Sequence, residues 1–156
     1  MKKIDLILLG RGYATEFIAS GVILAIVTWQ IPTNTITDTL HVVSGKLAIL
    51  TGGLMAASFG LLGVYFGQTS SEFGKYLSWR GVSTSYLAAF GMAGIYHVIT
   101  TISLIFFSAY KVESLALLCV FMLSMSVFNV FSLVTNLISI VRLRDLFNKE
   151  IAANNR

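Results

Sequence analysis

The stretch from Gly45 to Gly67, GKLAILTGGLMAASFGLLGVYFG, decides the fold expected of this chain. In water, each Gly in a helix costs about 1 kcal/mol relative to Ala. In lipid, small residues on one helix face instead let two backbones approach closely. At 100° per residue, one such face, called here the glycine face, contains six small residues: Gly45, Gly52, Ala56, Gly60, Gly63 and Gly67. The stretch therefore predicts a membrane-spanning helix with a helix-packing face. It leaves open whether the same chain or a second copy covers that face.

The composition extends this prediction to the whole chain. Of 156 residues, 56% are hydrophobic and only 12% are charged, whereas soluble domains average about 25% charged residues. A membrane span needs about 20 apolar residues. Four apolar runs approach or exceed this length: Phe17–Ile31, Leu47–Gly67, Leu87–Ala109 and Leu115–Val141.

With their flanking residues, these runs predict spans over 13–31, 40–67, 82–109 and 114–142, followed by a cytoplasmic tail helix over 142–153. Asp38 is the expected N-cap of the second helix. The predicted fold is an all-α membrane protein, an antiparallel bundle of four transmembrane helices in one integral-membrane domain over 1–156.

The first run follows basic residues, as the core of a secretory signal does. No small-x-small cleavage site follows Trp29, so we expect a retained span. Residues 1–12 fit either an interfacial helix with Gly10 and Gly12 as a hinge, or an extension of the first span.

Lysine and arginine are distributed unequally between the two ends of this bundle. One end would collect Lys2, Lys3, Arg11, Lys75, Arg80, Arg142, Arg144, Lys149 and Arg156. The other would hold only Lys46 and Lys111. Because basic residues favour the cytoplasmic side, we expect both termini to be cytoplasmic, with the chain crossing the cell inner (plasma) membrane four times.

Polar residues near the middle of the apolar runs are candidates for function. Ser58, His97, Asn129 and Asn136 form a candidate polar midplane cluster. An ionisable group inside the membrane is a functional candidate by default. The alternative role is interhelical hydrogen bonding, which stabilises a bundle by about 0.6 kcal/mol per bond.

Aromatic and apolar residues at the cytoplasmic end are candidates for partner docking. The second loop carries Thr69 and Glu72 at the spacing of a capping box, which predicts a short helix. The candidate docking residues are Phe73, Tyr76 and Trp79 in this loop and Leu143, Leu146, Phe147 and Ile151 in the tail. The loop aromatics also suit an ordinary membrane-border belt, and the tail's apolar stripe could be covered by its own loop, a second copy or another protein.

Glu16 is similar to the functional carboxylate that the small multidrug resistance transporters carry in the first of their four helices. The resemblance covers that feature alone, in a chain longer than that family, and it would imply a transport role for Glu16. Arg11 and Asp5 should prevent the span from extending toward the N-terminus. The alternative is that Glu16 lies in the first helical turn, where the helix dipole favours an acid.

The sequence gives no pattern of catalysis or cofactor binding. Cys119 is a single cysteine, which excludes a disulfide or a Cys-based metal site within one chain. Gly45-Lys46-Leu47 lacks the Ser or Thr of a phosphate-binding loop. We therefore expect no enzyme, no catalytic residues, no cofactor and no metal. Because the basic residues border the membrane and form no concentrated patch, we also expect no nucleic-acid partner.

Three functional hypotheses remain. The leading one is a non-catalytic integral-membrane subunit that forms a homo-oligomer in the lipid bilayer and anchors or signals to a cytoplasmic protein, in the manner of bacterial conflict or phage-defence assemblies. The second is a small channel or transporter with a path through the polar midplane. The third is an inner-membrane immunity protein against a pore-forming toxin.

Overall fold

The structure is a computed structural model that describes residues 6–68 and 70–154, and every described element is helical. The helices are α1 (Leu6–Gln30), α2 (Thr33–Gln68), α3 (Glu72–Trp79), α4 (Ser83–Tyr110) and α5 (Glu113–Asn154). Four of them, all but α3, are long and apolar enough to cross a membrane. The expected all-α class with four long helices is therefore confirmed.

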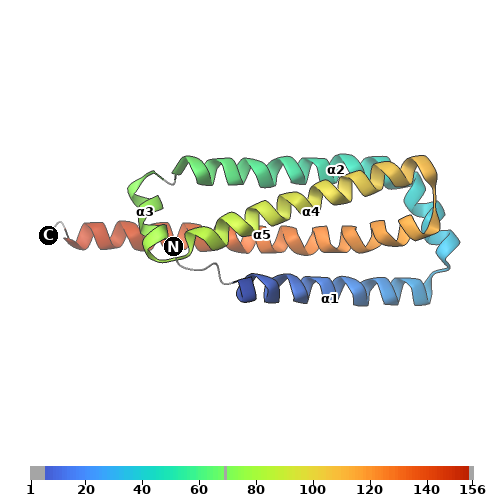
Figure 1. Ribbon diagram of the computed structural model, residues 1–156, viewed down its shortest axis with the longest axis horizontal. Coiled ribbons are helices and arrows are strands. Elements are labelled where there is room, and N and C mark those ends of the chain that lie inside the picture. Colours follow the sequence, from blue (N-terminus) through green and yellow to red (C-terminus); the bar gives the residue numbers. More distant parts are fainter. Residues whose placement is uncertain (1–5, 69, 155–156) are drawn as a thin grey trace.

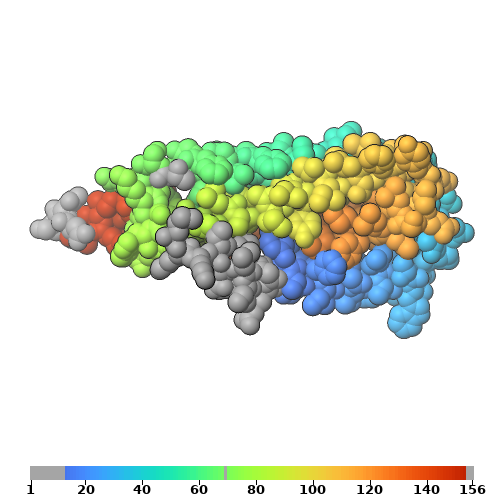
Figure 2. Space-filling view, in the orientation of Figure 1, coloured from blue at the N-terminus to red at the C-terminus, as the bar shows by residue number. Residues whose placement is uncertain are grey.

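The four long helices run antiparallel to their chain neighbours, with α4 and α5 between α2 and α1 (Figure 1). The largest helix contact is between α2 and α4, and α5 packs on α4, α1 and α2. In the space-filling view, α2 and the described part of α1 lie along opposite long edges (Figure 2). The start of α1, the end of α5 and α3 share one end of the bundle, called here the α3 end.

Proline sets the boundary between the first two helices. The residue before a proline is disfavoured in the helical conformation, and α1 ends at Gln30, before the Ile31-Pro32 pair. The Pro32 carbonyl accepts a hydrogen bond from Ile36 N at 3.1 Å, which starts α2. Helix α2 therefore begins before the predicted span 40–67, and the expected N-cap role of Asp38 is wrong. Asp38 lies within α2 because the polar turn 33–39 is helical.

At the end opposite α3, a salt bridge joins α2 to the α4–α5 turn. Lys111 ends α4 in a left-handed conformation with φ 45°, and its backbone N–H donates to the Phe107 carbonyl. Its Nζ lies 2.9 Å from Asp38 Oδ1. Both side chains are exposed, so this pair stabilises the fold by no more than about 1 kcal/mol.

Helix α1 is continuous through Gly10 and Gly12, so the structure has no hinge there, and the first span has a helical extension. Residues 1–5 of the proposed interfacial segment lie outside the described residues.

The core consists of two apolar clusters with a band of buried polar side chains between them. The cluster at the α3 end contains Tyr65, Phe73, Tyr76, Leu77, Phe90, Ala93 and Leu133. The cluster at the other end contains Leu40, Leu104, Phe107, Ala116 and Cys119. Along the helices between them lie Thr51, Ser58, His97, Thr100, Ser126 and Asn129, all buried. This band is where the structure places most of the predicted midplane cluster.

Candidate functional site: buried polar groups between the helices

Three of the four predicted midplane residues are fully enclosed, on three different helices. Ser58, His97 and Asn129 have exposed fractions of 0%, 0% and 1%. Asn136 is half-buried, about two turns nearer the α3 end. Ser58 Oγ donates to the Leu54 carbonyl and Asn129 Nδ2 to the Met125 carbonyl, each within its own helix.

His97 is buried without a hydrogen bond to either ring nitrogen. A buried polar atom without a hydrogen-bond partner destabilises the fold by about 1–3 kcal/mol. Burying His97 for packing alone would therefore be unfavourable. The backbone carbonyl of His97 accepts from Thr101 Oγ1 at 2.8 Å, which belongs to the ordinary helix pattern of threonine. The imidazole is therefore a buried titratable group without a hydrogen-bond partner in the middle of α4.

The side-chain hydrogen bonds that join helices in this band come from threonines and a serine that the predicted midplane cluster did not include. Thr51 Oγ1 lies 2.8 Å from Thr101 Oγ1 and joins α2 to α4. Thr100 Oγ1 lies 3.0 Å from Ser126 Oγ and joins α4 to α5. The signal in the sequence was the Thr100-Thr101 pair, whose hydroxyls project about 100° apart on α4 and so face two neighbours.

A second polar site, called here the Glu16 site, joins α1 to α5. Glu16 Oε1 accepts a hydrogen bond from Ser132 Oγ, while Glu16 Oε2 is buried and has no partner. Ser20 lies one turn further along α1, and its Oγ is also buried without a partner. Because α1 begins at Leu6, Glu16 is not in the first turn, and the helix-dipole explanation fails.

Tyr13 connects the Glu16 site to α4. Its hydroxyl donates to the Ala89 carbonyl at 3.4 Å. Its ring stacks on Tyr96 with 5.7 Å between centroids. Tyr96 precedes His97 in α4, so the Tyr13 ring contacts α4 one residue away from the polar band.

At the α3 end, the predicted docking residues divide into two groups. Phe73 and Tyr76 are buried, and their rings lie 5.6 Å and 5.2 Å from the Phe147 ring of α5. Leu143 and Phe147 are partly buried against the same cluster. The chain's own α3 therefore covers this part of the tail. Trp79, Leu146 and Ile151 remain exposed, Trp79 by 74%.

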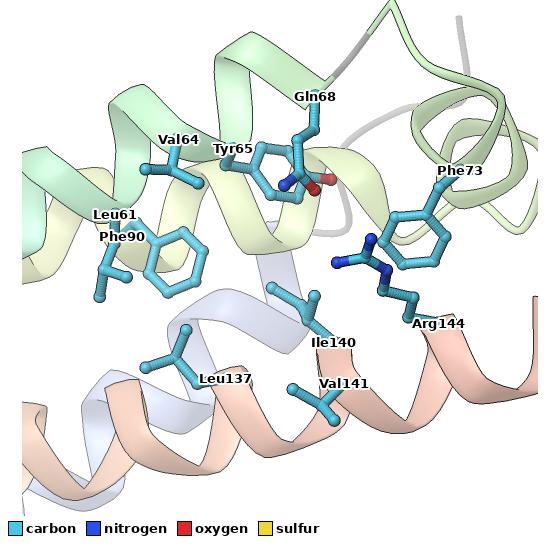
Figure 3. A pocket seen from close by; sticks show the side chains of 10 residues that line it. All are labelled: Leu61, Val64, Tyr65, Gln68, Phe73, Phe90, Leu137, Ile140, Val141 and Arg144. Atoms are coloured by element: carbon cyan, nitrogen blue, oxygen red, sulfur yellow. The ribbon is translucent and has the colours of Figure 1, made fainter.

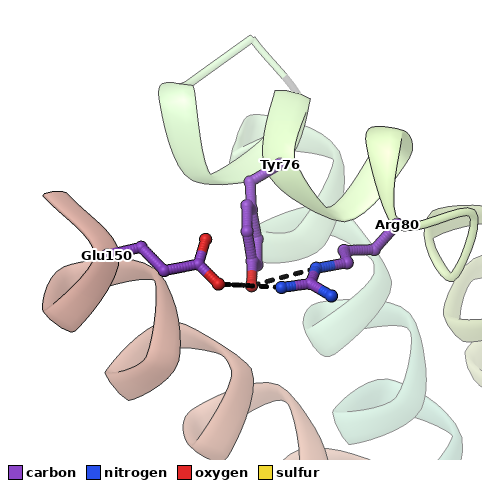
Figure 4. A network of polar contacts seen from close by, with 3 residues as sticks. All are labelled: Tyr76, Arg80 and Glu150. Atoms are coloured by element: carbon purple, nitrogen blue, oxygen red, sulfur yellow. Dashed lines mark hydrogen bonds and ion pairs between the residues drawn. The ribbon is translucent and has the colours of Figure 1, made fainter. Parts of the chain in front are cut away.

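A polar network lies beside these rings and also joins the α3 segment to α5 (Figure 4). Arg80 donates from Nε to the Tyr76 hydroxyl at 3.1 Å and from Nη2 to Glu150 Oε1 at 2.8 Å. The hydrogen bond to Tyr76 and the nearby Glu150 carboxylate raise the pKa of Arg80 above its ordinary value. The N-cap of α3 is Ser71, whose side chain accepts from Gly74 N, and not the predicted Thr69, which lies outside the described residues.

The glycine face is uncovered within the described chain. A Cβ built at Gly45, Gly52, Gly60, Gly63 or Gly67 would meet no neighbouring atom within 4 Å. The glycine that makes a close contact is in α4. A Cβ at Gly94 would lie 2.9 Å from the Phe59 ring of α2. The close approach of α2 and α4 thus uses a glycine of α4, and the glycine face of α2 points elsewhere.

Comparison with known proteins does not place this chain in a family. Comparison of the chain with protein-family models, with curated proteins and with solved structures finds no match. Within residues 6–68 and 70–154, no three His, Cys, Asp or Glu side chains are grouped as a metal site. The uncovered glycine face and the buried polar groups are therefore the features of the chain that bear on its function.

Proposed function

We propose that this chain is a non-catalytic integral-membrane subunit that forms a homo-oligomer through the glycine face of α2 and anchors or signals to a cytoplasmic protein. The observation that carries the proposal is the uncovered glycine face: a Cβ built at any of its five glycines would meet no neighbouring atom of the described chain within 4 Å. A partner backbone can approach such a face closely, and close approach supplies the dispersion contacts that associate helices in lipid. A second copy of α2 meets this requirement symmetrically.

The proposed orientation places the α3 end in the cytoplasm of a cell with an inner membrane. The described basic residues at that end include Lys75, Arg80, Arg142 and Arg144, whereas Lys46 and Lys111 are near the other end. Arginine and lysine near the ends of spans favour the cytoplasmic side.

The surface proposed for the cytoplasmic partner is smaller than the sequence suggested. It consists of Trp79, Leu146 and Ile151, the docking candidates that α3 and α5 leave exposed. A bacterial conflict or phage-defence assembly is the setting we propose for such a subunit, by analogy of architecture.

The test is a leucine substitution on the glycine face. A Cβ at Gly60 meets no neighbouring atom within 4 Å, so the Gly60→Leu subunit should still fold. Its side chain would hold a partner helix away, and self-association should weaken roughly tenfold, the change that 1.4 kcal/mol produces. Analytical ultracentrifugation in detergent and energy transfer between labelled copies in liposomes measure this.

The matched control is Ala25→Leu, an equivalent enlargement at an exposed residue of α1. Self-association should not change in that variant. A Gly60→Leu protein that associates as tightly as the parent would refute oligomerisation through this face. Equal weakening in both variants would mean that added bulk anywhere disturbs the assembly.

The second candidate function is a small proton-conducting channel or transporter, because buried titratable atoms remain unpartnered. Besides His41 Nδ1 in α2, they are Glu16 Oε2 and both ring nitrogens of His97, which lie on two helices that Tyr13 and Tyr96 connect. Intramembrane carboxylates and histidines are the usual elements of proton relays. No contact among the described residues favours the immunity-protein hypothesis, which stays a prediction.

Proton flux into liposomes that contain only this protein tests the second candidate. A relay predicts flux driven by a pH gradient that falls at least tenfold in Glu16→Gln and in His97→Gln. Ser124→Ala, which removes a hydroxyl bonded only to the Val120 carbonyl of its own helix, should keep the flux. No flux above that of empty liposomes would eliminate the relay while leaving the subunit proposal intact.

A further inference from the structure

An apolar cavity of about 140 Å³ lies between α2, α4 and α5 near the α3 end (Figure 3). Its wall includes Tyr65, Phe90, Leu137 and Ile140. Two polar side chains join these apolar ones, Gln68 from α2 and Arg144 from α5. The cavity is distinct from the polar band and from the Glu16 site, and neither proposed function uses it.

The cavity opens toward the surface that lipid would cover. Val64 and Val141 line it, and they are 62% and 60% exposed. Both valines lie in the helical segments long and apolar enough to cross a membrane. In a bilayer, the opening would face the acyl chains, so a hydrocarbon chain could enter without crossing water.

The polar end of the cavity carries an uncompensated positive charge. The Arg144 side chain reaches over the cavity beside Phe73 (Figure 3). The two salt bridges among the described residues use Arg80 and Lys111 and leave Arg144 without an acidic partner. Arg144 is one turn beyond Val141 on α5, just past the end of the span predicted over 114–142.

We propose that this cavity binds one anionic phospholipid, with part of an acyl chain between α2 and α5 and the headgroup phosphate on the Arg144 guanidinium. Arginine donates two hydrogen bonds to a phosphate in a fixed planar geometry. Basic pockets between transmembrane helices on the cytoplasmic side bind anionic headgroups in this manner. Gln68 is placed to add a polar contact from the other helix.

The occupant is a lipid and not a soluble anion, because the wall beneath Arg144 is apolar. A free phosphate would use the guanidinium and leave the apolar cavity unfilled. A second protein copy is a poorer fit, since the glycine face, where a helix could approach closely, consists of other residues of α2. The proposal does not require the chain to oligomerise.

Native mass spectrometry of delipidated protein in detergent tests the site. Phosphatidylglycerol and phosphatidylethanolamine with identical acyl chains are titrated separately, and inorganic phosphate and glycerophosphoglycerol compete in parallel titrations. We expect a single tight phosphatidylglycerol adduct that neither soluble competitor displaces. Arg144→Gln should weaken this adduct roughly fivefold, the size of one basic contact near a lipid surface. Arg142→Gln removes the same charge from an exposed neighbour outside the cavity and should leave the adduct unchanged.

A second pair of variants tests the apolar part without changing charge. Val141→Trp should block the opening and weaken the phosphatidylglycerol adduct by a similar factor. Val134→Trp, at another exposed valine of α5 that does not line the cavity, should have no effect. Both substitutions are at exposed positions and should leave the fold intact.

Three outcomes would overturn the proposal. Equal binding of phosphatidylglycerol and phosphatidylethanolamine would show that the headgroup charge does not determine binding. Equal weakening of phosphatidylglycerol binding by Arg144→Gln and Arg142→Gln would show that general surface charge, and not a specific contact of Arg144, attracts the lipid. Displacement by inorganic phosphate or by glycerophosphoglycerol would identify a site for a soluble anion and not for a lipid.

Discussion

At the residue scale, individual side chains in this protein differ mainly in whether they have a partner. The hydroxyls of Thr100 and Ser126 hydrogen-bond to each other between α4 and α5. The His97 ring nitrogens, Ser20 Oγ and one carboxylate oxygen of Glu16 are buried without a hydrogen-bond partner. The same contrast holds for glycines. Gly94 is in close contact with Phe59, whereas Gly60 has open space beside it. The effects of substitution should follow these local differences and not residue type.

Gly94→Leu should destabilise the folded subunit by about 1–3 kcal/mol, the usual cost of overpacking. The added side chain would enter the space of the Phe59 ring, which lies 2.9 Å from the position of a Cβ at Gly94. Thermal unfolding in detergent measures the loss.

Adding Phe59→Ala to the Gly94→Leu chain should recover part of the lost stability, because it removes the ring that the leucine side chain would contact. Gly53→Leu, the same substitution at an exposed glycine of α2 outside the glycine face, is the control and should leave the melting temperature unchanged. A Gly94→Leu protein as stable as the parent would show that α2 and α4 do not pack closely at this point.

At the element scale, α3 acts as a clamp on the C-terminal part of α5. Its rings at Phe73 and Tyr76 pack on Phe147, and the exposed Arg80–Glu150 pair lies beside them. Burial of aromatic surface should contribute most of the stability of this contact, because exposed ion pairs typically contribute about 0–1 kcal/mol. The clamp also forms part of the wall of the proposed lipid cavity, through Phe73.

Phe147→Ala should therefore release α3 more than Glu150→Gln does. Hydrogen exchange of the amides of residues 72–79 should become faster by at least tenfold in Phe147→Ala, equivalent to about 1.4 kcal/mol. Glu150→Gln should change it about fivefold or less, with the effect disappearing at high salt.

Phe131→Ala, at a largely exposed aromatic residue of α5, provides the control for loss of a ring and should leave exchange of α3 unchanged. If Glu150→Gln released α3 as much as Phe147→Ala did, the ion pair and not the aromatic contact would hold the clamp.

At the scale of the whole molecule, the unequal distribution of basic residues between the two ends of the bundle is the basis of the proposed orientation. The α3 end combines the basic residues, the clamp and the cavity, whereas the opposite end has the Asp38–Lys111 pair and a tight turn. The α3 end is therefore the end for which we propose contact with headgroups and with a protein partner.

Cysteine labelling tests this orientation, because the native Cys119 is fully buried and should react slowly. Thr35→Cys places a thiol at an exposed residue opposite the α3 end, and Ser70→Cys places one at the α3 end. A membrane-impermeant maleimide should label Thr35→Cys in intact cells and Ser70→Cys only after permeabilisation. The reverse pattern would place the α3 end outside the cell.

The amino-acid sequence by itself determined the helical class and the position of the four long helices. This is because apolar run length is a local property that each segment carries independently of its neighbours. It also identified Ser58, His97 and Asn129 as polar residues at similar depth, since depth follows from position along a run. Helix ends were less predictable, as α2 begins at Thr33 through a polar turn that favoured a loop by composition.

Only the tertiary structure decided which faces are covered. It paired Glu16 with Ser132, residues 116 positions apart, and it covered part of the tail with α3. It also left the glycine face of α2 uncovered while using Gly94 for the close helix contact. Periodicity shows which residues share a face, but which face meets a neighbour depends on the mutual packing of all the helices. For that reason the glycine face is available for a second copy, a property that the sequence of α2 alone left open.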